Sequence, residues 1–252
     1  MSYTFVVSNC SGSCARIKTK FNPPLELDKN KRYEMALVNL ETYWSFPNIN
    51  ENNGYFHITV IGKSGYSFQI KTGAYELTEI NSYIQQTLKD LGAKKDIISF
   101  TANRNTLKCT MTIAENCIVS FVNKNTIASL LGFDNKVYNA GVYESENIIN
   151  IININSIYVH NNLISHSYID GSLSPVLYSF FPTTGVGEKI IEKPRERVYS
   201  PVNLNTIVGM QTWLTDQNNN DLDLQGENLT MRFHLREVSN SYLEQMVKLM
   251  EK

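Results

Sequence analysis

Short runs of β-branched and aromatic residues, separated by clusters of Asn, Gly, Asp and Pro, recur along most of this chain. Runs of that length and composition are typical of β-strands bounded by turns. In the last run, apolar residues from Leu229 to Leu235 alternate with polar ones, as in a strand with one buried face. The pattern predicts strands at residues 3–7, 33–40, 55–61, 66–70, 97–102, 106–113, 118–122, 176–181, 188–191, 198–199, 206–214 and 229–235.

One longer segment, 79–91, has the 3.6-residue periodicity of an amphipathic helix instead. Thr78 stands where an N-cap is expected, and Gly92 follows the last periodic residue, where a helix commonly ends. The side chains expected on its buried stripe are Ile80, Tyr83, Ile84, Thr87, Leu88 and Leu91.

Two shorter segments also read as helices. Residues 126–131 lie between Asn125 as a cap and Gly132, and residues 240–252 carry Tyr242, Leu243, Met246, Leu249 and Met250 on one side. With so many strand-like runs and two or three short helices, we expect a mainly β protein. Its predicted architecture is a set of jelly-roll-like antiparallel sandwich units.

A polar, irregular stretch at 138–147 suggests a boundary between two halves. We therefore expect an N-terminal β-unit at 1–137, a C-terminal β-unit at 148–238 and a helical arm at 239–252. Terminal segments are usually mobile unless they dock onto something. Two alternatives stay open for the arm: it folds back on its own subunit, or it contacts a neighbouring subunit.

The chain has 252 residues and a formal net charge of −1. Proteins that coat nucleic acid by charge neutralisation carry a basic excess, so direct nucleic-acid binding is not expected. The most basic run, 189–197, is balanced by its own glutamates. A membrane-spanning helix needs about 18 consecutive apolar residues, and every apolar stretch of this chain is interrupted well before that length. Residues 1–10 lack the basic region and the long apolar run of a signal peptide.

The four cysteines are Cys10, Cys14, Cys109 and Cys117. Their spacing does not give the close, repeated pairs of a structural zinc site, and no histidine stands beside them at ligand spacing. Reduced thiols in an intracellular compartment are the simplest expectation. A bridge between Cys10 and Cys14 stays open as an alternative.

We find no nucleophile elbow, phosphate-binding loop, zinc-protease motif or dinucleotide turn. The four histidines are His57, His160, His166 and His234, and we expect them on the solvated faces of strands. Residues 216–227 imitate a calcium loop through Asp216, Asn218, Asn220 and Glu227, but Asp221 stands where the loop needs glycine. We read this segment as a β-turn. We therefore predict no catalytic, cofactor-binding or metal-binding residues, and no enzyme.

Several motifs in a fixed order resemble those of capsid-associated proteins from Polinton (Maverick) elements and adintoviruses. They are Pro47–Asn48–Ile49, the Gly73-x-Tyr75 lead-in to the first helix, Leu131–Gly132–Phe133, the 198–203 segment and the 216–227 segment. Glycine and proline at these places also suit turns between strands and helices. The resemblance spans residues 30–236.

This resemblance implies a penton-like, minor capsid subunit, since the family's double-barrel major capsid protein is much longer. The implied partners are copies of the chain and other capsid proteins, with no small-molecule substrate. The implied location is the virion, assembled in the cytoplasm or nucleus of a host cell. Two alternatives remain: a fibre-base or receptor-attachment protein of the virion, and a cellular interaction protein domesticated from such an element.

Overall fold

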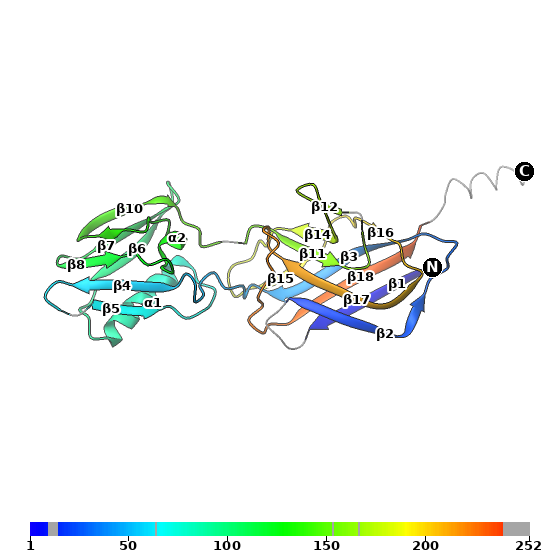
Figure 1. The fold of residues 1–252 in the computed structure, drawn as a ribbon, viewed down its shortest axis with the longest axis horizontal. Helices are drawn as coiled ribbons and strands as arrows, with labels where there is room; N and C mark the ends of the chain where they lie inside the picture. Colours follow the sequence, from blue (N-terminus) through cyan, green and yellow to red (C-terminus); the bar gives the residue numbers. More distant parts are fainter. Residues whose placement is uncertain (10–14, 64, 153, 166, 239–252) are drawn as a thin grey trace, which may run out of the picture. The chain divides into compact units, whose positions relative to one another are not determined.

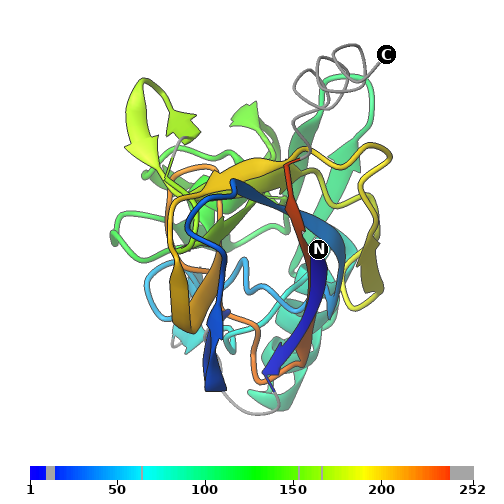
Figure 2. The ribbon, with the colours of Figure 1, turned by 90° about the vertical axis from the view of Figure 1, so that its right-hand side faces the viewer.

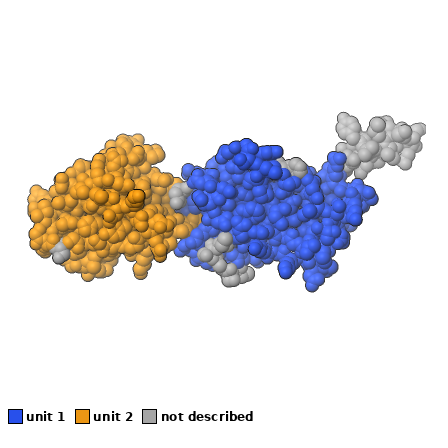
Figure 3. Space-filling model, in the orientation of Figure 1, with its two compact units in different colours: residues 1–44, 154–252 blue, residues 45–153 orange. Residues whose placement is uncertain are grey.

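In the computed structural model, the described residues are 1–9, 15–63, 65–152, 154–165 and 167–238. The chain divides into two compact units, coloured separately in Figure 3. Unit 1 is made of Met1–Trp44 and Ile154–Lys252, and unit 2 is Ser45–Asn153. Unit 2 is thus an insertion in the sequence of unit 1.

This division differs from the expected units at 1–137 and 148–238. The strands of unit 1 that come first in the chain pair with those that come last, and local composition carries no record of such distant pairing. The polar stretch that suggested a boundary is itself a strand of unit 2. The expected arm at 239–252 lies outside the described residues.

The two large sheets of unit 1 are both antiparallel (Figure 1). One has the order β1-β18-β3-β15, with β16 also on β3, and the other has the order β14-β11-β17-β2. Numbered one to eight along the chain, with β15 and β16 together as the sixth, the strands run 1-8-3-6 and 5-4-7-2, which is the order of an eight-stranded jelly roll. The bounds are β1 Ser2–Asn9, β2 Arg16–Glu26, β3 Tyr33–Tyr43, β11 Ile157–Asn161, β14 Val176–Phe180, β15 Lys189–Glu192, β16 Ser200–Val202, β17 Thr206–Thr215 and β18 Leu229–Glu237.

Figure 2 shows β1 beside β18 in one layer, and β2 beside β17 in the other. The predicted alternation in β18 is confirmed, because Leu229, Met231, Phe233 and Leu235 are all fully buried between the layers. Phe5 of β1 contacts Phe21 of β2, with ring centroids 5.2 Å apart. A short hairpin of β12 (Ser167–Ile169) and β13 (Ser172–Ser174) forms a separate two-stranded sheet.

Unit 2 contains two smaller antiparallel sheets, ordered β5-β4-β8-β9 and β10-β7-β6. Its apolar core includes an edge-to-face aromatic group in which Phe56 contacts both Phe100 and Phe121. The predicted strands at 97–102 and 106–113 are confirmed as β6 and β7, which pair from Ile98↔Ile113 to Asn103↔Lys108. The bounds are β4 Tyr55–Val60, β5 Gly65–Gln69, β6 Ile98–Asn103, β7 Lys108–Ile113, β8 Cys117–Ser120, β9 Val137–Tyr138 and β10 Gly141–Ile148.

Helix α1 spans Leu77–Asp90, close to the predicted 79–91. Its N-cap is Glu76, which forms a capping box with Glu79, so the expected cap at Thr78 is wrong. Gly92 follows the C-cap with a φ of +83°, as expected. The residues buried by the helix are Ile80, Ile84 and Leu88, whereas Leu91 is half exposed.

Helix α2 is only Ala128–Leu131, with Ile127 rather than Asn125 at the N-cap and Gly132 at the C-cap. Of the residues that the structure describes, half lie in strands and 8% in helices, which confirms the mainly β, jelly-roll-like prediction. The predicted strand at 198–199 is displaced to β16. The strands with no counterpart among the predicted ones are β2, β9, β10 and β11, together with the β12–β13 hairpin.

Candidate interaction sites

The incoming and outgoing chains of unit 2 are joined by one buried side chain, Asn48. Its Nδ2 donates hydrogen bonds to the carbonyl oxygens of Tyr75 (2.7 Å) and Ile151 (3.0 Å). Its Oδ1 accepts the backbone N–H of Tyr75 at 3.0 Å. Ile49 and Gly73 also exchange backbone hydrogen bonds of 3.0 and 3.1 Å. We call these segments, 47–49, 73–75 and 147–151, the root of unit 2.

A second contact in the root depends on Gly132. This residue has a φ of +81°, and a Cβ built on it would lie 2.3 Å from the carbonyl oxygen of Asn147. Its own carbonyl accepts the N–H of Asn147 at 2.8 Å, and Leu130 accepts the N–H of Asn150 at 2.9 Å. The motifs around Asn48 and Gly132 therefore hold the two ends of the inserted unit together.

Strand β10 is polar, yet it is firmly bonded within unit 2. Burial raises the pKa of Glu146, but hydrogen bonds from the Lys136 ammonium, the backbone N–H of Asp134 and the Tyr138 hydroxyl outweigh it and lower that pKa to about 2. Ser145 is buried and accepts the N–H of Cys109 at 3.0 Å. These contacts explain why a stretch that reads as a linker forms a strand.

Helix α1 covers one edge of the β10-β7-β6 sheet with side-chain amides. Asn81 Oδ1 accepts the backbone N–H of Phe100 at 2.9 Å, and Gln85 Nε2 donates to the carbonyl oxygen of Ile98. The two amides stand one helical turn apart and bond to backbone groups of the edge strand β6. Edge strands with unpaired backbone groups tend to recruit other strands, so this arrangement protects the edge. It also places Gln85, which is not part of the expected buried stripe, against the sheet.

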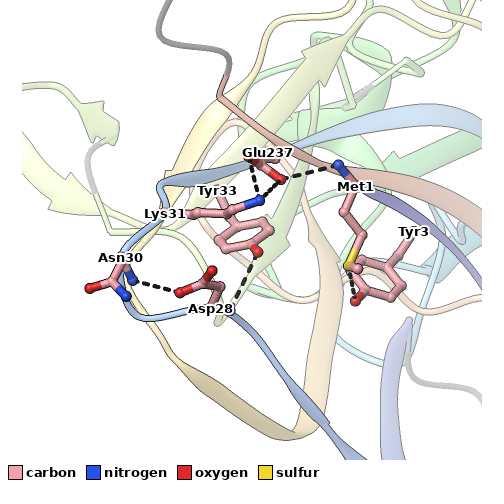
Figure 4. Close-up of polar contacts among 7 residues, drawn as sticks. All are labelled: Met1, Tyr3, Asp28, Asn30, Lys31, Tyr33 and Glu237. Atoms are coloured by element: carbon pink, nitrogen blue, oxygen red, sulfur yellow. Dashed lines mark hydrogen bonds and ion pairs between the residues drawn. The ribbon is translucent and has the colours of Figure 1, made fainter.

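In unit 1, a groove of 570 Å³ lies beside Val238, the last described residue of the chain. Figure 4 shows the polar contacts at one side of it, where Glu237 pairs with Lys31 at 2.9 Å and with the Met1 amino group at 3.1 Å. A hydrogen bond from Lys31 lowers the pKa of Glu237. Tyr33 and Glu34 from β3, and residues 201–205 around β16, complete the lining.

The expectation that all histidines lie on solvated faces is wrong for His160, which is only 1% exposed. Its ring stacks on Trp213 with centroids 4.9 Å apart, and the Arg16 guanidinium lies 4.7 Å from the Trp213 ring centre. These three flat groups stand in register on β11, β17 and β2. Burial lowers the pKa of His160 to about 4. The Arg16 guanidinium forms an ion pair with Asp221, with Nη2 and Oδ1 3.0 Å apart, at the end of this row of side chains.

The other described histidines lie at the surface with hydroxyl partners. His57 lies 2.6 Å from Ser67 Oγ and 3.0 Å from Thr59 Oγ1, and His234 lies 2.8 Å from the Tyr199 hydroxyl. His166 lies outside the described residues. Among the residues that the structure describes, no group of three or more His, Cys, Asp or Glu side chains could hold a metal ion.

In the segment compared with a calcium loop, Asp216 bonds to its own loop. Its Oδ1 accepts the backbone N–H groups of Asn218 and Asn220, at 2.9 and 2.8 Å, and its Oδ2 accepts Asn220 Nδ2 at 3.0 Å. Asp216 N–H in turn donates to the carbonyl of Asn220 at 2.9 Å. The segment is thus a closed turn built on one aspartate.

Two of the cysteines, Cys109 and Cys117, are free and buried in unit 2. Burial raises the pKa of Cys109 to about 12 and also raises that of Cys117. Such thiols are poor nucleophiles. Cys10 and Cys14 lie outside the described residues, so their bridging stays a prediction.

In the run at 189–197, one basic residue and one acidic residue have partners outside the run. Lys189 pairs with Glu41 at 2.8 Å, Ile190 is buried, and Glu192 accepts the Tyr178 hydroxyl at 2.8 Å. Within the described ranges, no helix combines the length and the apolar character that crossing a membrane requires.

Comparison with protein-family models and with curated proteins gave no match. Among solved structures, the crystal structure of the mavirus penton protein matches with a TM-score of 0.52 and 12% sequence identity. The match covers 94% of this chain and 100% of the mavirus chain. This chain shares the fold of that protein. Because mavirus is related to Maverick (Polinton) elements, the resemblance seen in the motifs is confirmed at the level of fold.

A second solved structure, the D2–D3 domains of the flagellar cap protein FliD from Escherichia coli, matches over 86% of this chain and 100% of its own. The identity is again 12%, but the TM-score is 0.17.

Proposed function

We propose that this chain is a structural, non-enzymatic subunit of a viral capsid, in a penton-like minor position. The observation that carries the proposal is the fold shared with the mavirus penton protein over 94% of the chain. The internal organisation supports it, since one jelly roll carries an inserted β-unit in the connection between its third and fourth strands. The proposed location is the virion, with assembly inside the host cell.

Assembly would use contacts with copies of the chain and with other capsid proteins. A feature that suits such contacts is the β12–β13 hairpin, where Tyr168 and Leu173 face each other across the strands. They are 69% and 64% exposed. Exposed aromatic and aliphatic side chains that stand together are typical anchors of protein interfaces.

The oligomeric state of the purified chain tests this proposal. We expect size-exclusion chromatography with light scattering, and negative-stain images, to show a closed ring-like oligomer. The double variant Tyr168→Ser/Leu173→Ser should weaken it, whereas Val208→Ser, which changes an equally exposed side chain on β17, should not. A chain that stays monomeric at all concentrations contradicts self-assembly.

The C-terminal segment supplies a further test of assembly. Its apolar residues, Tyr242, Met246 and Leu249, would suit docking on a neighbouring subunit. Deleting residues 240–252 should then leave the thermal midpoint nearly unchanged while it weakens oligomer formation. A large drop in the midpoint with unchanged assembly would show that the segment belongs to its own subunit.

A further inference from the structure

Unit 2 carries a groove beside helix α1 whose lining is polar and basic. Its volume is 710 Å³, within the range of about 300–1,000 Å³ that is usual for ligand sites. The lining comes from the side of α1 next to β6 and from the turn that follows the helix. The residues are Asn81, Ser82, Gln85, Gln86, Lys89, Ala93, Lys94, Lys95 and Asp96.

The charge of the groove differs from that of the whole chain. Three lysines, Lys89, Lys94 and Lys95, face one aspartate, Asp96, whereas the chain as a whole has a net charge of −1. All three lysines are exposed, and none forms an ion pair with another described residue. An ammonium group is a compact point charge that suits single anionic groups such as sulfate or carboxylate. The groove therefore favours an anionic ligand.

The amides between these lysines are held in fixed orientations. Asn81 and Gln85 are bonded to the edge of β6 as described above, and Gln86 Nε2 donates to Asp90 at 2.7 Å. Each amide keeps a second polar group for a ligand: Nδ2 of Asn81 as a donor, and Oε1 of Gln85 and Gln86 as acceptors. Donors and acceptors placed between positive charges match a polyhydroxylated molecule that also carries anions.

Two other anionic classes fit the groove less well. No aromatic or arginine side chain lines it, so it offers no platform on which the bases of a single-stranded nucleic acid could stack. An acidic peptide would need apolar pockets or an open strand edge, but Ala93 is the only apolar residue in the lining. The Asn81 and Gln85 amides already cover β6 at this place.

We propose that this groove binds a sulfated glycan. The site lies wholly within unit 2, and the inference neither requires nor follows from the capsid role. It would give the chain a second activity, attachment to a sulfated polysaccharide. Because exposed charges are screened at physiological salt, the affinity should fall steeply as the salt concentration rises.

The test uses the full-length chain and a sulfated hexasaccharide from heparin, with binding measured by calorimetry at physiological ionic strength. The variant Lys89→Ala/Lys94→Ala/Lys95→Ala should bind at least about tenfold more weakly, as the loss of three charge contacts implies. The matched control Lys63→Ala/Lys71→Ala/Lys124→Ala removes the same charge from exposed lysines of unit 2 outside the groove. It should change the affinity less than about twofold. Circular dichroism checks that both variants are folded.

Three further probes decide the class of ligand: the desulfated hexasaccharide, an oligothymidine and a polyglutamate peptide. All three should bind much more weakly than the sulfated hexasaccharide. The inference is overturned if wild type does not bind the sulfated hexasaccharide, if both triple variants lose affinity equally, or if any of the three probes binds as tightly. None of these outcomes bears on assembly, so the capsid role stands or falls separately.

Discussion

Asn48 closes the root of unit 2 through the hydrogen bonds of its side-chain amide. Replacing Asn48 with alanine removes three hydrogen bonds and leaves the carbonyls of Tyr75 and Ile151 and the N–H of Tyr75 without this partner. Asn48 is 5% exposed, so these groups are poorly hydrated. An unsatisfied buried polar group costs about 1–3 kcal/mol, and partial rescue by water brings the expected loss to about 3–5 kcal/mol.

The two units can be followed separately, because both tryptophans, Trp44 and Trp213, lie in unit 1. Far-UV circular dichroism reports on the strands of both units. In urea unfolding, Asn48→Ala should therefore shift part of the circular dichroism change, the part due to unit 2, to lower urea concentration. The transition seen by tryptophan fluorescence should move much less. Amide hydrogen exchange at residues 147–151 should be faster in the same variant, because the hydrogen bond from Asn48 to the carbonyl of Ile151 is lost.

Two further variants test whether the loss of stability comes from the hydrogen bonds of Asn48 or from any substitution in this loop. Asn48→Asp keeps the size of the side chain but places a carboxylate against two carbonyl oxygens, so it should destabilise at least as much as alanine. Asn52→Ala changes an exposed asparagine of the same loop and should stay within about 0.5 kcal/mol. If Asn48→Ala leaves the circular dichroism transition and the exchange at 147–151 unchanged, the root is not held as described.

Four other predictions follow from the packing and the pKa values. Leu88→Ala should cost about 2–5 kcal/mol in urea unfolding, because the side chain is fully buried, whereas the exposed neighbour Lys89→Ala should stay within about 0.5 kcal/mol. Gly132→Ala should sharply lower the thermal midpoint, since the new Cβ would strike a carbonyl oxygen; an unchanged midpoint would refute that geometry. The His160 side chain takes up a proton near pH 6.5 in the unfolded chain but only near pH 4 in the folded one, so the free energy of unfolding should be highest above pH 6.5 and fall by about 3 kcal/mol towards pH 4. In urea melts, His160→Phe should flatten this pH dependence. An unchanged pH dependence would rule out His160 as its source. Mass-detected alkylation of Cys109 should require unfolding, and rapid labelling of the native chain would contradict its burial.

Strand content and strand faces could be read from the sequence where packing follows local alternation. Strand β18 shows this, because every second side chain is fully buried. Strand β2 could not be read in the same way, since Pro23 and Pro24 interrupt it and its outward residues include Lys18 and Lys20. It forms because β17 pairs with it, with a shift in register around Val208. An edge strand of this kind tolerates proline and lysine.

The division into units could not be predicted from the sequence pattern either, because it also depends on pairing between strands that are far apart in the chain. Strand β1 pairs with β18 from Ser2↔Arg236 onward, and no local signal marks a partner so far along the chain. His160 shows the corresponding limit for single residues. The prediction placed His160 on a solvated strand face, but Trp213 and Thr215 of the neighbouring strand cover it, and the sequence alone does not bring these residues together.

The motifs behind the resemblance had a physical content that only the structure reveals. Asn48 and Tyr75 are 27 residues apart, yet they share two of the hydrogen bonds that close the root. Gly132 suggested only the end of a helix, but its close contact with Asn147 also fixes the outgoing chain. Two of the motifs that led to the resemblance are therefore the places where the inserted unit is fastened.

A capsid role for this chain can be measured on purified particles. Particles would be purified by density gradient from cells that express the genome encoding the chain, and their proteins would be quantified by mass spectrometry. We predict that the chain sediments with the particles at a fixed ratio to the major capsid protein, well below one to one, and that the ratio survives repeated banding. If the chain stays at the top of the gradient while complete particles band without it, it is not a capsid subunit.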